Sequence, residues 1–156
     1  MEVKTLQRLD LYKINRKDHP GGSFLLRALW VLLARPIVSS HIPGTIWRKF
    51  ILRLFGAEIG IGGRIKPNLK VTFPWKLKIG NHCWLGEYLW IDNLAEVKIG
   101  NQVCISQGAF LCTGNHNYKS NLFDLSLGPI EIEDHAWIAA KCIIAPGTLI
   151  GEGTIV

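Results

Sequence analysis

The chain has 156 residues, 48% of them hydrophobic, which is enough for one modest domain with a core of its own and argues against a disordered chain. Its four cysteines form no CxxC motif, which argues against a disulfide framework or a zinc ribbon and favours a reducing compartment. The formal net charge of +6 lies entirely in residues 1–58, which hold ten Lys and Arg against four Asp and Glu, whereas residues 59–156 hold eight of each.

Residues 1–58 are predicted to form an N-terminal helical region. The longest apolar run, "SFLLRALWVLLARPIV", is interrupted by Arg27 and Arg35 and reaches Pro36 near its end. It therefore predicts a helix over residues 24–38 rather than a membrane span. The first residues of the chain are charged and no apolar run follows them directly, so we expect no signal peptide.

The stretch "GTIWRKFILRLFG" predicts an amphipathic helix. Its apolar residues fall on one face, and Arg48, Lys49 and Arg53 fall on the other. Thr45 can cap the start of this helix and Gly56 its end. A basic helix that contains tryptophan suits peripheral contact with a membrane surface, and packing on the rest of the protein is an equally weighted alternative. We expect no nucleic acid partner, because the basic residues are interleaved with apolar ones and no recognised binding motif is present.

From Ile59 onward the chain has a different period, because aliphatic residues recur every six positions in four series. The series are Ile59, Ile65, Val71 and Leu77; Ile79, Leu85, Ile91 and Val97; Ile99, Ile105 and Leu111; and Ile132, Ile138, Ile144, Ile150 and Val156. Period six is typical of a parallel β-helix of hexapeptide repeats, in which three strands and three turns make one triangular coil and stacked coils share an aliphatic core. Residues 59–156 are therefore predicted to form an all-β domain.

Two further features support this interpretation. The position two before each aliphatic residue should also point inward and be small or apolar, as it is at Cys83, Val103, Ala109, Ala136, Cys142, Thr148 and Thr154. "KIGN" occurs at 78–81 and again at 98–101, twenty residues apart, which predicts a coil of three hexads with two extra residues at a corner. Glycine and asparagine suit the corners because they tolerate positive φ.

The repeat stops after "CTGNHNY" and resumes at Ile132. Residues 117–129 are expected to leave the β-helix as a loop, so His116 would stand where a coil corner opens into that loop. Rigid scaffolds commonly carry function at such places, and an imidazole titrates near neutral pH, as a general base should. The alternative is a loop histidine that only satisfies nearby backbone groups.

This pattern, with "CTGNHNY", a protruding loop and then "IEIEDHAWIAAKCIIAPGTLIGEGTIV", resembles the left-handed β-helix acyltransferases of the galactoside, maltose and nodulation-factor O-acetyltransferase group. The segments "RALWVLL", "LRLFGAEIG" and "WIDNLAEVKIGNQVCISQGAFLCTGNHNY" are most similar to the colanic acid biosynthesis acetyltransferase family. The resemblance implies a left-handed parallel β-helix and a homotrimer with acetyl-coenzyme A in the cleft between subunits. It also implies acetyl transfer to a sugar hydroxyl in polysaccharide synthesis, without a metal.

The resemblance also implies a set of site residues. They are the catalytic base His116, Asp92 as a contact of the acceptor sugar, and Trp137, which helps shape the active site. We also expect Asn115 and Trp137 to bind the substrate, and Trp137, Ala139 and Ala140 to bind the cofactor. Ala139 stands where the family often has glycine. The alternative for Asp92 is a corner carboxylate that caps backbone N–H groups, and the alternative for Asn115 is a turn residue.

The acceptor is expected to be a sugar or a lipid-linked saccharide, and the protein to be cytoplasmic, at the inner face of the membrane if its N-terminal helices bind lipid. A zinc-dependent carbonic anhydrase of the β-helix type needs three converging histidines, and this chain has none at positions 111 and 121. The other alternative is a non-catalytic β-helix scaffold. The chain ends at "GEGTIV", part-way through a coil, whereas the family is expected to continue into a C-terminal tail that helps bind coenzyme A.

Overall fold

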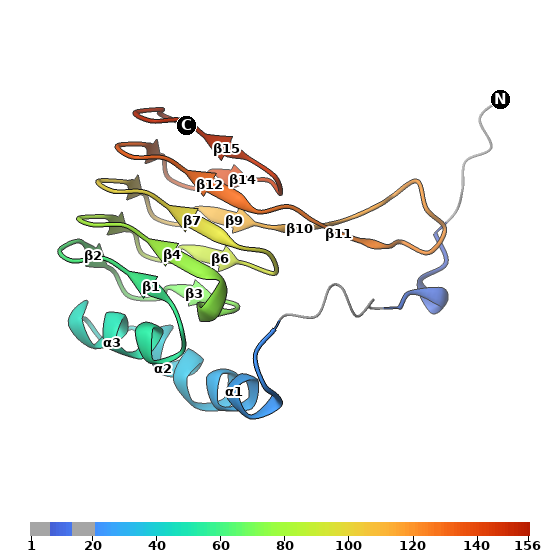
Figure 1. Cartoon of the computed structure of the whole chain (residues 1–156), viewed down its shortest axis with the longest axis horizontal. Coiled ribbons are helices and arrows are strands. Elements are labelled where there is room, and N and C mark those ends of the chain that lie inside the picture. Colours follow the sequence, from blue (N-terminus) through green and yellow to red (C-terminus); the bar gives the residue numbers. More distant parts are fainter. Residues whose placement is uncertain (1–6, 14–20) are drawn as a thin grey trace.

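Parallel strands stacked in three sheets form the body of the protein (Figure 1). The computed structural model describes residues 7–13 and 21–156, so part of the predicted helical region, residues 1–6 and 14–20, lies outside the described residues. Each turn of the chain contributes one strand to each sheet, and these strands pair in parallel with the strands of the next turn. The predicted left-handed parallel β-helix of hexapeptide repeats is confirmed.

The three sheets are named in the order in which the chain visits them. The first sheet contains β1 (Glu58–Ile59), β4 (Leu77–Ile79), β7 (Val97–Ile99), β12 (Ile130–Ile132) and β15 (Leu149–Ile150). The second contains β2 (Arg64–Ile65), β5 (Trp84–Leu85), β8 (Cys104–Ile105) and β13 (Trp137–Ile138). The third contains β3 (Lys70–Val71), β6 (Trp90–Asp92), β9 (Phe110–Cys112) and β14 (Ile143–Ile144).

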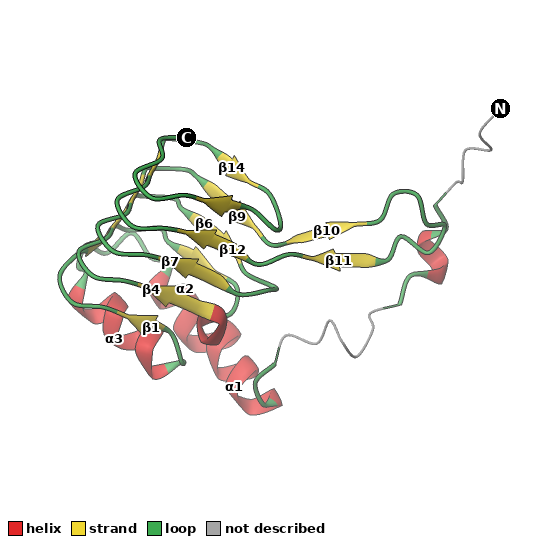
Figure 2. Ribbon diagram, turned by 45° about the horizontal axis from the view of Figure 1, so that its top comes forward, coloured by secondary structure: helices red, strands yellow, loops and turns green. Residues whose placement is uncertain are grey.

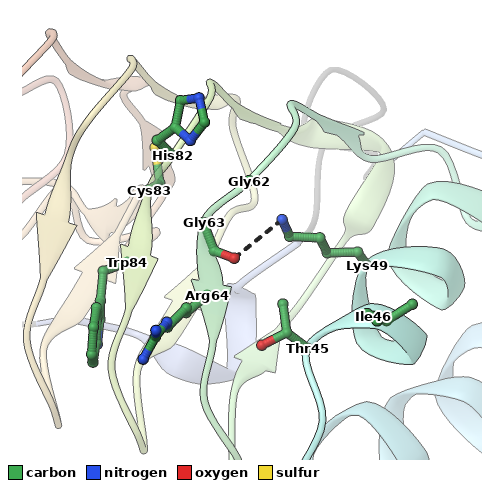
Figure 3. Close-up of a pocket in the computed structure, with 9 residues that line it drawn as sticks. All are labelled: Thr45, Ile46, Lys49, Gly62, Gly63, Arg64, His82, Cys83 and Trp84. Carbon is green, nitrogen blue, oxygen red and sulfur yellow. Dashed lines mark hydrogen bonds between the residues drawn. The ribbon is translucent and has the colours of Figure 1, made fainter.

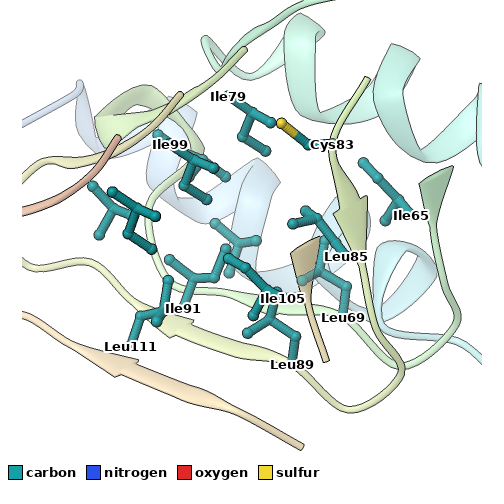
Figure 4. Packing of buried hydrophobic residues seen from close by; sticks show 14 of the residues in the cluster. Ile65, Leu69, Ile79, Cys83, Leu85, Leu89, Ile91, Ile99, Ile105 and Leu111 are labelled. Carbon is teal, nitrogen blue, oxygen red and sulfur yellow. The ribbon is translucent and has the colours of Figure 1, made fainter. Parts of the chain in front are cut away.

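The aliphatic residues of the repeat lie in register from coil to coil and form the core (Figure 4). In the second sheet Ile65 pairs with Leu85, Leu85 with Ile105, and Ile105 with Ile138. All four side chains are buried, and burying one such side chain stabilises the fold by about 1.5–3 kcal/mol. The column of in-register aliphatic side chains is therefore the main source of stability.

The second set of inward positions is buried in the middle of the stack and less so at its upper end. Cys83, Val103, Ala109 and Ala136 are buried as predicted. In the last coil, by contrast, Cys142 and Thr148 are only half-buried, and Thr154 is exposed.

The glycines that directly follow the aliphatic residues have a different role from the predicted one. Gly80 does not have a positive φ. Instead, a Cβ at this position would lie only 2.5 Å from the carbonyl oxygen of Gly100 in the next coil, so the close approach of two backbones requires glycine. The left-handed conformation falls three residues after the aliphatic residue, at His82 (φ 58°), Gln102 (φ 57°) and His135 (φ 62°). Gly108 (φ 70°) and Gly147 (φ 75°) occupy the same position in other hexads, where glycine has its predicted role.

A ladder of side-chain oxygens holds the corner between the first and second sheets. Asn81 Oδ1 accepts a hydrogen bond from the backbone N–H of Ile61 at 2.9 Å, and Asn101 Oδ1 accepts one from Asn81 at 2.8 Å. Asp134 Oδ1 continues the ladder by accepting from the backbone N–H of Asn101 at 2.7 Å. This backbone hydrogen bond, and then the side-chain amide of Asn101, lower the pKa of the Asp134 carboxyl.

Short helices cover the lower end of the β-helix (Figure 1). They are α1 (Phe24–Leu29), the π-helix η3 (Trp30–Ala34), α2 (Arg35–Val38) and α3 (Ile46–Leu54), with the 3-10 turns η1 (Leu9–Leu11) and η4 (Pro74–Lys76) elsewhere. Trp30 and Leu52 are fully buried, and the indole of Trp30 donates to the carbonyl of Thr72 at 2.9 Å. The helices over residues 24–38 and around residue 50 are confirmed, and the division of the chain at residue 58 stays a prediction.

The polar face predicted for α3 is wrong at Arg48. This side chain has 0% of its surface exposed. Its guanidinium donates to the carbonyls of Val38, Ser40, Ile42 and Gly44 at 2.6–3.0 Å. Those carbonyls lie at the C-terminal end of α2 and in the bend that leads to α3, where no helix satisfies them. The five N–H donors of an arginine suit that task.

The predicted cap of α3 is also wrong in detail. The helix begins at Ile46 as predicted, but the Thr45 side chain makes no capping hydrogen bond. Its hydroxyl instead bonds the backbone N–H and the carbonyl of Ile65 at 3.2 Å, and so ties the helix to β2. Among residues 7–13 and 21–156, no helix has the length and apolarity needed to cross a membrane.

The corner ladder predicts a specific acid sensitivity. The folded-state pKa of Asp134 lies below its unfolded value, so its stabilising effect is present above the ordinary Asp value near ~3.9 and is lost as pH falls through the lower folded value. Asp134→Asn should keep the ladder, as Asn101 does one coil below, and should flatten the acid limb of stability. The measurement is the free energy of unfolding by urea between pH 7 and pH 2.5. Equal acid limbs in both proteins would contradict the assignment.

Candidate functional site

An arm of two antiparallel strands leaves the β-helix after β9 (Figure 2). It consists of β10 (Gly114–His116) and β11 (Leu125–Leu127) with the residues between them. His116 therefore lies within the arm, paired with Leu125, rather than at the corner itself. The segment predicted as a loop, residues 117–129, forms the outer part and the returning strand of this arm.

The contacts of His116 fix the orientation of its imidazole and the tautomer of the neutral ring. Its Nδ1 lies 2.8 Å from the carbonyl oxygen of Phe123. A carbonyl can only accept, so Nδ1 carries the hydrogen, and in the neutral imidazole Nε2 is then the nitrogen with the lone pair. The ring also stacks on the ring of Phe123, with centroids 4.1 Å apart and planes at 4°. Phe123 has a φ of 52°. Both its ring and its carbonyl contact His116.

A residue from the N-terminal segment completes the surroundings of His116. The Tyr12 ring meets the imidazole edge-on, with centroids 5.6 Å apart and planes at 68°. The backbone N–H of Arg8 donates to the carbonyl of Asn121 at 2.7 Å and so fixes this segment to the tip of the arm. Neither Tyr12 nor Phe123 is predicted from the sequence as a site residue, because neither belongs to a repeat or a motif.

Asp92 and Asn115 lie near the root of the arm. Asp92 pairs with Cys112 at the end of β9, and its Oδ1 accepts from the hydroxyl of Thr72 at 2.7 Å. The carboxylate thus bonds a side chain of the neighbouring coil, and not the backbone N–H group that the alternative interpretation expects. Asn115 is exposed, and its Oδ1 accepts from the backbone N–H of His116 at 2.8 Å.

Trp137, Ala139 and Ala140 lie on a different side of the molecule. Trp137 is in β13 of the second sheet, half-exposed, and its Nε1 donates to the hydroxyl of Ser106 at 2.9 Å. Ala139 and Ala140 follow in the next corner. The arm leaves the third sheet and returns into the first, so its corner is opposite the second sheet of the triangle. One copy of the chain therefore does not bring Trp137 to His116.

The three outer faces of the triangle differ in chemistry. The first sheet carries ion pairs, Lys98 with Glu131 at 2.5 Å and Lys78 with Glu96 at 3.1 Å. The second sheet presents Arg64, Trp84, Cys104 and Trp137 in one outward column. The third presents Lys70, Trp90, Phe110 and Ile143, in which Trp90 and Phe110 stack with centroids 4.6 Å apart. The second and third faces thus expose aromatic and apolar surface.

Within residues 7–13 and 21–156, no group of three or more His, Cys, Asp or Glu side chains is arranged to hold a metal ion. All four cysteines are free thiols. The site around His116 is thus built from one imidazole, two aromatic rings and backbone groups.

Comparison with known proteins agrees with this architecture. No protein-family model matches the sequence. The chain is 36% identical over 151 residues to the Escherichia coli (strain K12) protein named "Putative colanic acid biosynthesis acetyltransferase WcaF", covering 97% of this chain and 83% of that protein.

Solved structures share the fold at low sequence identity. A hexapeptide-repeat acetyltransferase from Vibrio cholerae, complexed with acetyl-coenzyme A, superposes with a TM-score of 0.72 at 22% identity, over 84% of this chain and 72% of that one. A maltose O-acetyltransferase from Clostridium difficile gives a TM-score of 0.64 at 19% identity, over 86% and 78%.

The fold and these likenesses define a hexapeptide-repeat acetyltransferase. Within that class, the chain belongs to the family of the colanic acid biosynthesis acetyltransferase WcaF. The family predicted from the sequence is confirmed.

The contact between Tyr12 and His116 can be tested without any assay of activity. Tyr12→Ala should shift the Cε1–H resonance of His116 in a proton–carbon NMR spectrum, because the ring that meets its imidazole is removed. Tyr118→Ala is the matched control, since Tyr118 lies on the same arm with its ring 67% exposed to solvent. A resonance that responds equally to both changes would contradict the contact.

Proposed function

We propose that this chain transfers the acetyl group of acetyl-coenzyme A to a hydroxyl of a sugar during surface polysaccharide synthesis, with His116 as the general base. The hydrogen bond from His116 Nδ1 to the Phe123 carbonyl carries this proposal, because in the neutral imidazole it makes Nε2 the acceptor. Stacking on Phe123 holds the imidazole in that orientation. The names of the relatives, a colanic acid biosynthesis acetyltransferase and a maltose O-acetyltransferase, support the reaction class.

The chemistry needs few groups. Nε2 of His116 takes the proton of the sugar hydroxyl while the oxygen attacks the carbonyl carbon of the thioester. The tetrahedral intermediate collapses by breaking the carbon–sulfur bond, and the leaving thiolate takes the proton back from the imidazolium. The products are the sugar acetate and coenzyme A, and His116 returns to its starting state. Backbone N–H groups at a coil corner can stabilise the oxyanion.

The site is proposed to form between copies in a homotrimer. His116 and Trp137 lie on opposite sides of one chain, so a substrate that touches both must lie between two chains. The aromatic column of the third sheet, which includes Trp90 and Phe110, provides apolar surface for such contacts. Trp137, Ala139 and Ala140 of one copy would then line the acetyl-coenzyme A cleft that faces the arm of the next.

Asp92 and Asn115 are proposed to position the acceptor. Both lie at the root of the arm that carries His116. The Asp92 carboxylate, already oriented by the Thr72 hydroxyl, can accept a hydrogen bond from a sugar hydroxyl. Asn115 holds the backbone at His116 through its oxygen, and its amide N–H groups can donate to the same sugar.

His116→Ala should lower kcat for acetyl transfer by roughly 10²–10⁴-fold, the usual contribution of a general base. The variant should stay folded, because His116 lies in the arm outside the aliphatic core. His41→Ala is the control, since His41 is exposed in the bend before α3. The measurement is steady-state transfer from acetyl-coenzyme A to a panel of sugars, and near-normal turnover by His116→Ala would remove this residue from the mechanism.

We further propose that the protein is cytoplasmic and contacts the inner face of the membrane through its N-terminal helices. Large apolar side chains of these helices are exposed, namely Phe24, Leu25, Leu32, Leu33, Ile46, Phe50 and Leu54. Arg53, exposed on α3, supplies positive charge beside them. Arg48 does not, because it is buried. A basic residue near anionic lipid contributes about 1 kcal/mol, and an apolar stripe on a helix inserts at the interface.

Co-sedimentation with liposomes tests this contact. The chain should bind vesicles with anionic lipid more tightly than neutral ones, and high salt should weaken the binding. Phe50→Glu and Leu32→Glu should each reduce it, because these side chains are 66% and 71% exposed and can change without disturbing the core. Tyr118→Glu on the arm is the control. Equal sedimentation of all variants would assign the helices to packing alone.

A further inference from the structure

A cavity of about 640 Å³ lies between the start of α3 and the lower end of the second sheet (Figure 3). Its lining includes neither His116 nor any residue assigned to acetyl-coenzyme A. Its lining includes Lys49, Gly62, Gly63, Arg64, His82 and Trp84.

The cavity has positive charge without a counter-charge. No acidic residue lines it. Among the residues that the structure describes, neither Lys49 nor Arg64 takes part in an ion pair. Lys49 Nζ only reaches the carbonyl of Gly63 at 3.4 Å. Burial, and then the positive charge of Arg53, lower the pKa of the Lys49 ammonium. Lys49 is half-buried and Arg64 is exposed, and a half-buried cation without an ion-pair partner favours an anion from solution.

An aromatic ring stands beside these charges. The Arg64 guanidinium lies 5.0 Å from the centroid of the Trp84 ring, and Lys66 Nζ lies 5.6 Å from it. Figure 3 shows Arg64 and Trp84 side by side on neighbouring strands. An indole face also stacks on the apolar face of a sugar or a ring. The wall therefore offers two kinds of contact, one for an anion and one for a ring.

Two glycines form the part of the cavity wall next to Arg64. Gly62 and Gly63 both have positive φ, 63° and 64°. A Cβ on Gly62 would lie 2.2 Å from Nδ1 of His82, and one on Gly63 would lie 2.3 Å from the carbonyl oxygen of Cys83. Only glycine fits both the conformation and the space at these two positions of the cavity wall.

We propose that this cavity binds the phosphate or diphosphate group of a lipid-linked saccharide, which is the acceptor. The identity of the ligand as acceptor rests on the proposed function. Arg64 and Trp84 belong to the same outward column as Cys104 and Trp137. The arm leaves from the coil that contains β8, two strands above β2, which is about 10 Å at the ordinary strand spacing.

The sugar, the phosphate and the lipid of one ligand would follow one another along the second sheet. The sugar to be acetylated would lie at the level of the arm of a neighbouring copy. The phosphate would lie lower, against Lys49 and Arg64. The lipid would continue toward α3, where Ile46 both lines the cavity and belongs to the exposed apolar stripe. The cavity thus lies between the coil from which the arm leaves and the helices proposed to contact the membrane.

Binding can be measured directly on the full chain by calorimetry, with farnesyl diphosphate as the probe. Farnesyl diphosphate should bind, farnesol should not, and inorganic diphosphate should bind more weakly. Lys49→Gln and Arg64→Gln should each weaken farnesyl diphosphate binding about tenfold or more, the usual effect of losing a charge-assisted hydrogen bond. Lys70→Gln is the matched control, because it removes one charge from the same coil, where Lys70 lies over Trp90 on another face.

Several results would overturn the proposal. One is the absence of farnesyl diphosphate binding by the parent chain. Another is an equal loss of affinity in Lys70→Gln and in the two cavity variants, all with unchanged circular dichroism spectra. Inorganic diphosphate binding as tightly as farnesyl diphosphate would assign the cavity to a soluble phosphate and overturn the lipid-linked ligand. A matching loss of coenzyme A affinity in the cavity variants would assign the cavity to the cofactor.

The His116→Ala variant separates this proposal from the proposed reaction. It should bind farnesyl diphosphate as the parent does, because His116 is on the arm and not in the cavity. Loss of acetyl transfer with retained binding supports both proposals. Binding without any acetyl transfer by the parent chain would overturn the reaction and leave the phosphate site standing.

Discussion

Every part of this structure depends on the register of one aliphatic side chain upon the next. A coil can bury its inward residues only if the coils above and below place theirs at the same point of the triangle. Ile65, Leu85, Ile105 and Ile138 meet this condition in the second sheet. The same condition brings backbones together at the corners, so Gly80 cannot carry a Cβ. It also requires a left-handed residue at each such corner, even where that residue is His82 or Gln102.

The arm does not disturb this register, because the chain returns to the β-helix at the point where it left. The backbone N–H of Gly128 donates to the carbonyl of Thr113 at 2.9 Å, so the chain returns to the point that it left. β12 then pairs with β7 as though no residues had intervened. The core is therefore independent of the sequence of the arm, and the arm can hold His116 in an environment that a regular coil does not offer. The arm is held by the pairing of β10 with β11, by the hydrogen bond between His116 and the Phe123 carbonyl, and by the contact of the N-terminal segment with its tip.

The helices at the lower end do more than close the first coil. Trp30 and Leu52 cover the aliphatic column there, as a cap must. The helices are held in place by polar contacts rather than by apolar packing alone, since Arg48 gathers the carbonyls of the bend and Thr45 ties α3 to β2. The face of α3 that carries Ile46, Phe50 and Leu54 is exposed and does not pack on the β-helix. Its exposed apolar side chains and the neighbouring cationic cavity are therefore surfaces available for a lipid or its phosphate.

The sequence by itself determined the features that repeat. The period of six predicts the β-helix, the core residues and the coils of 20 residues, because each hexad repeats the same local conformation and the same burial. The break in that period located the arm and His116. Only the tertiary structure decided the features that join distant segments: Tyr12 against His116, Asp92 bonded to Thr72, Arg48 buried, and Trp137 on the side opposite the arm. Such contacts leave no periodic mark, since each is made once, between residues whose separation along the chain says nothing of their distance in space.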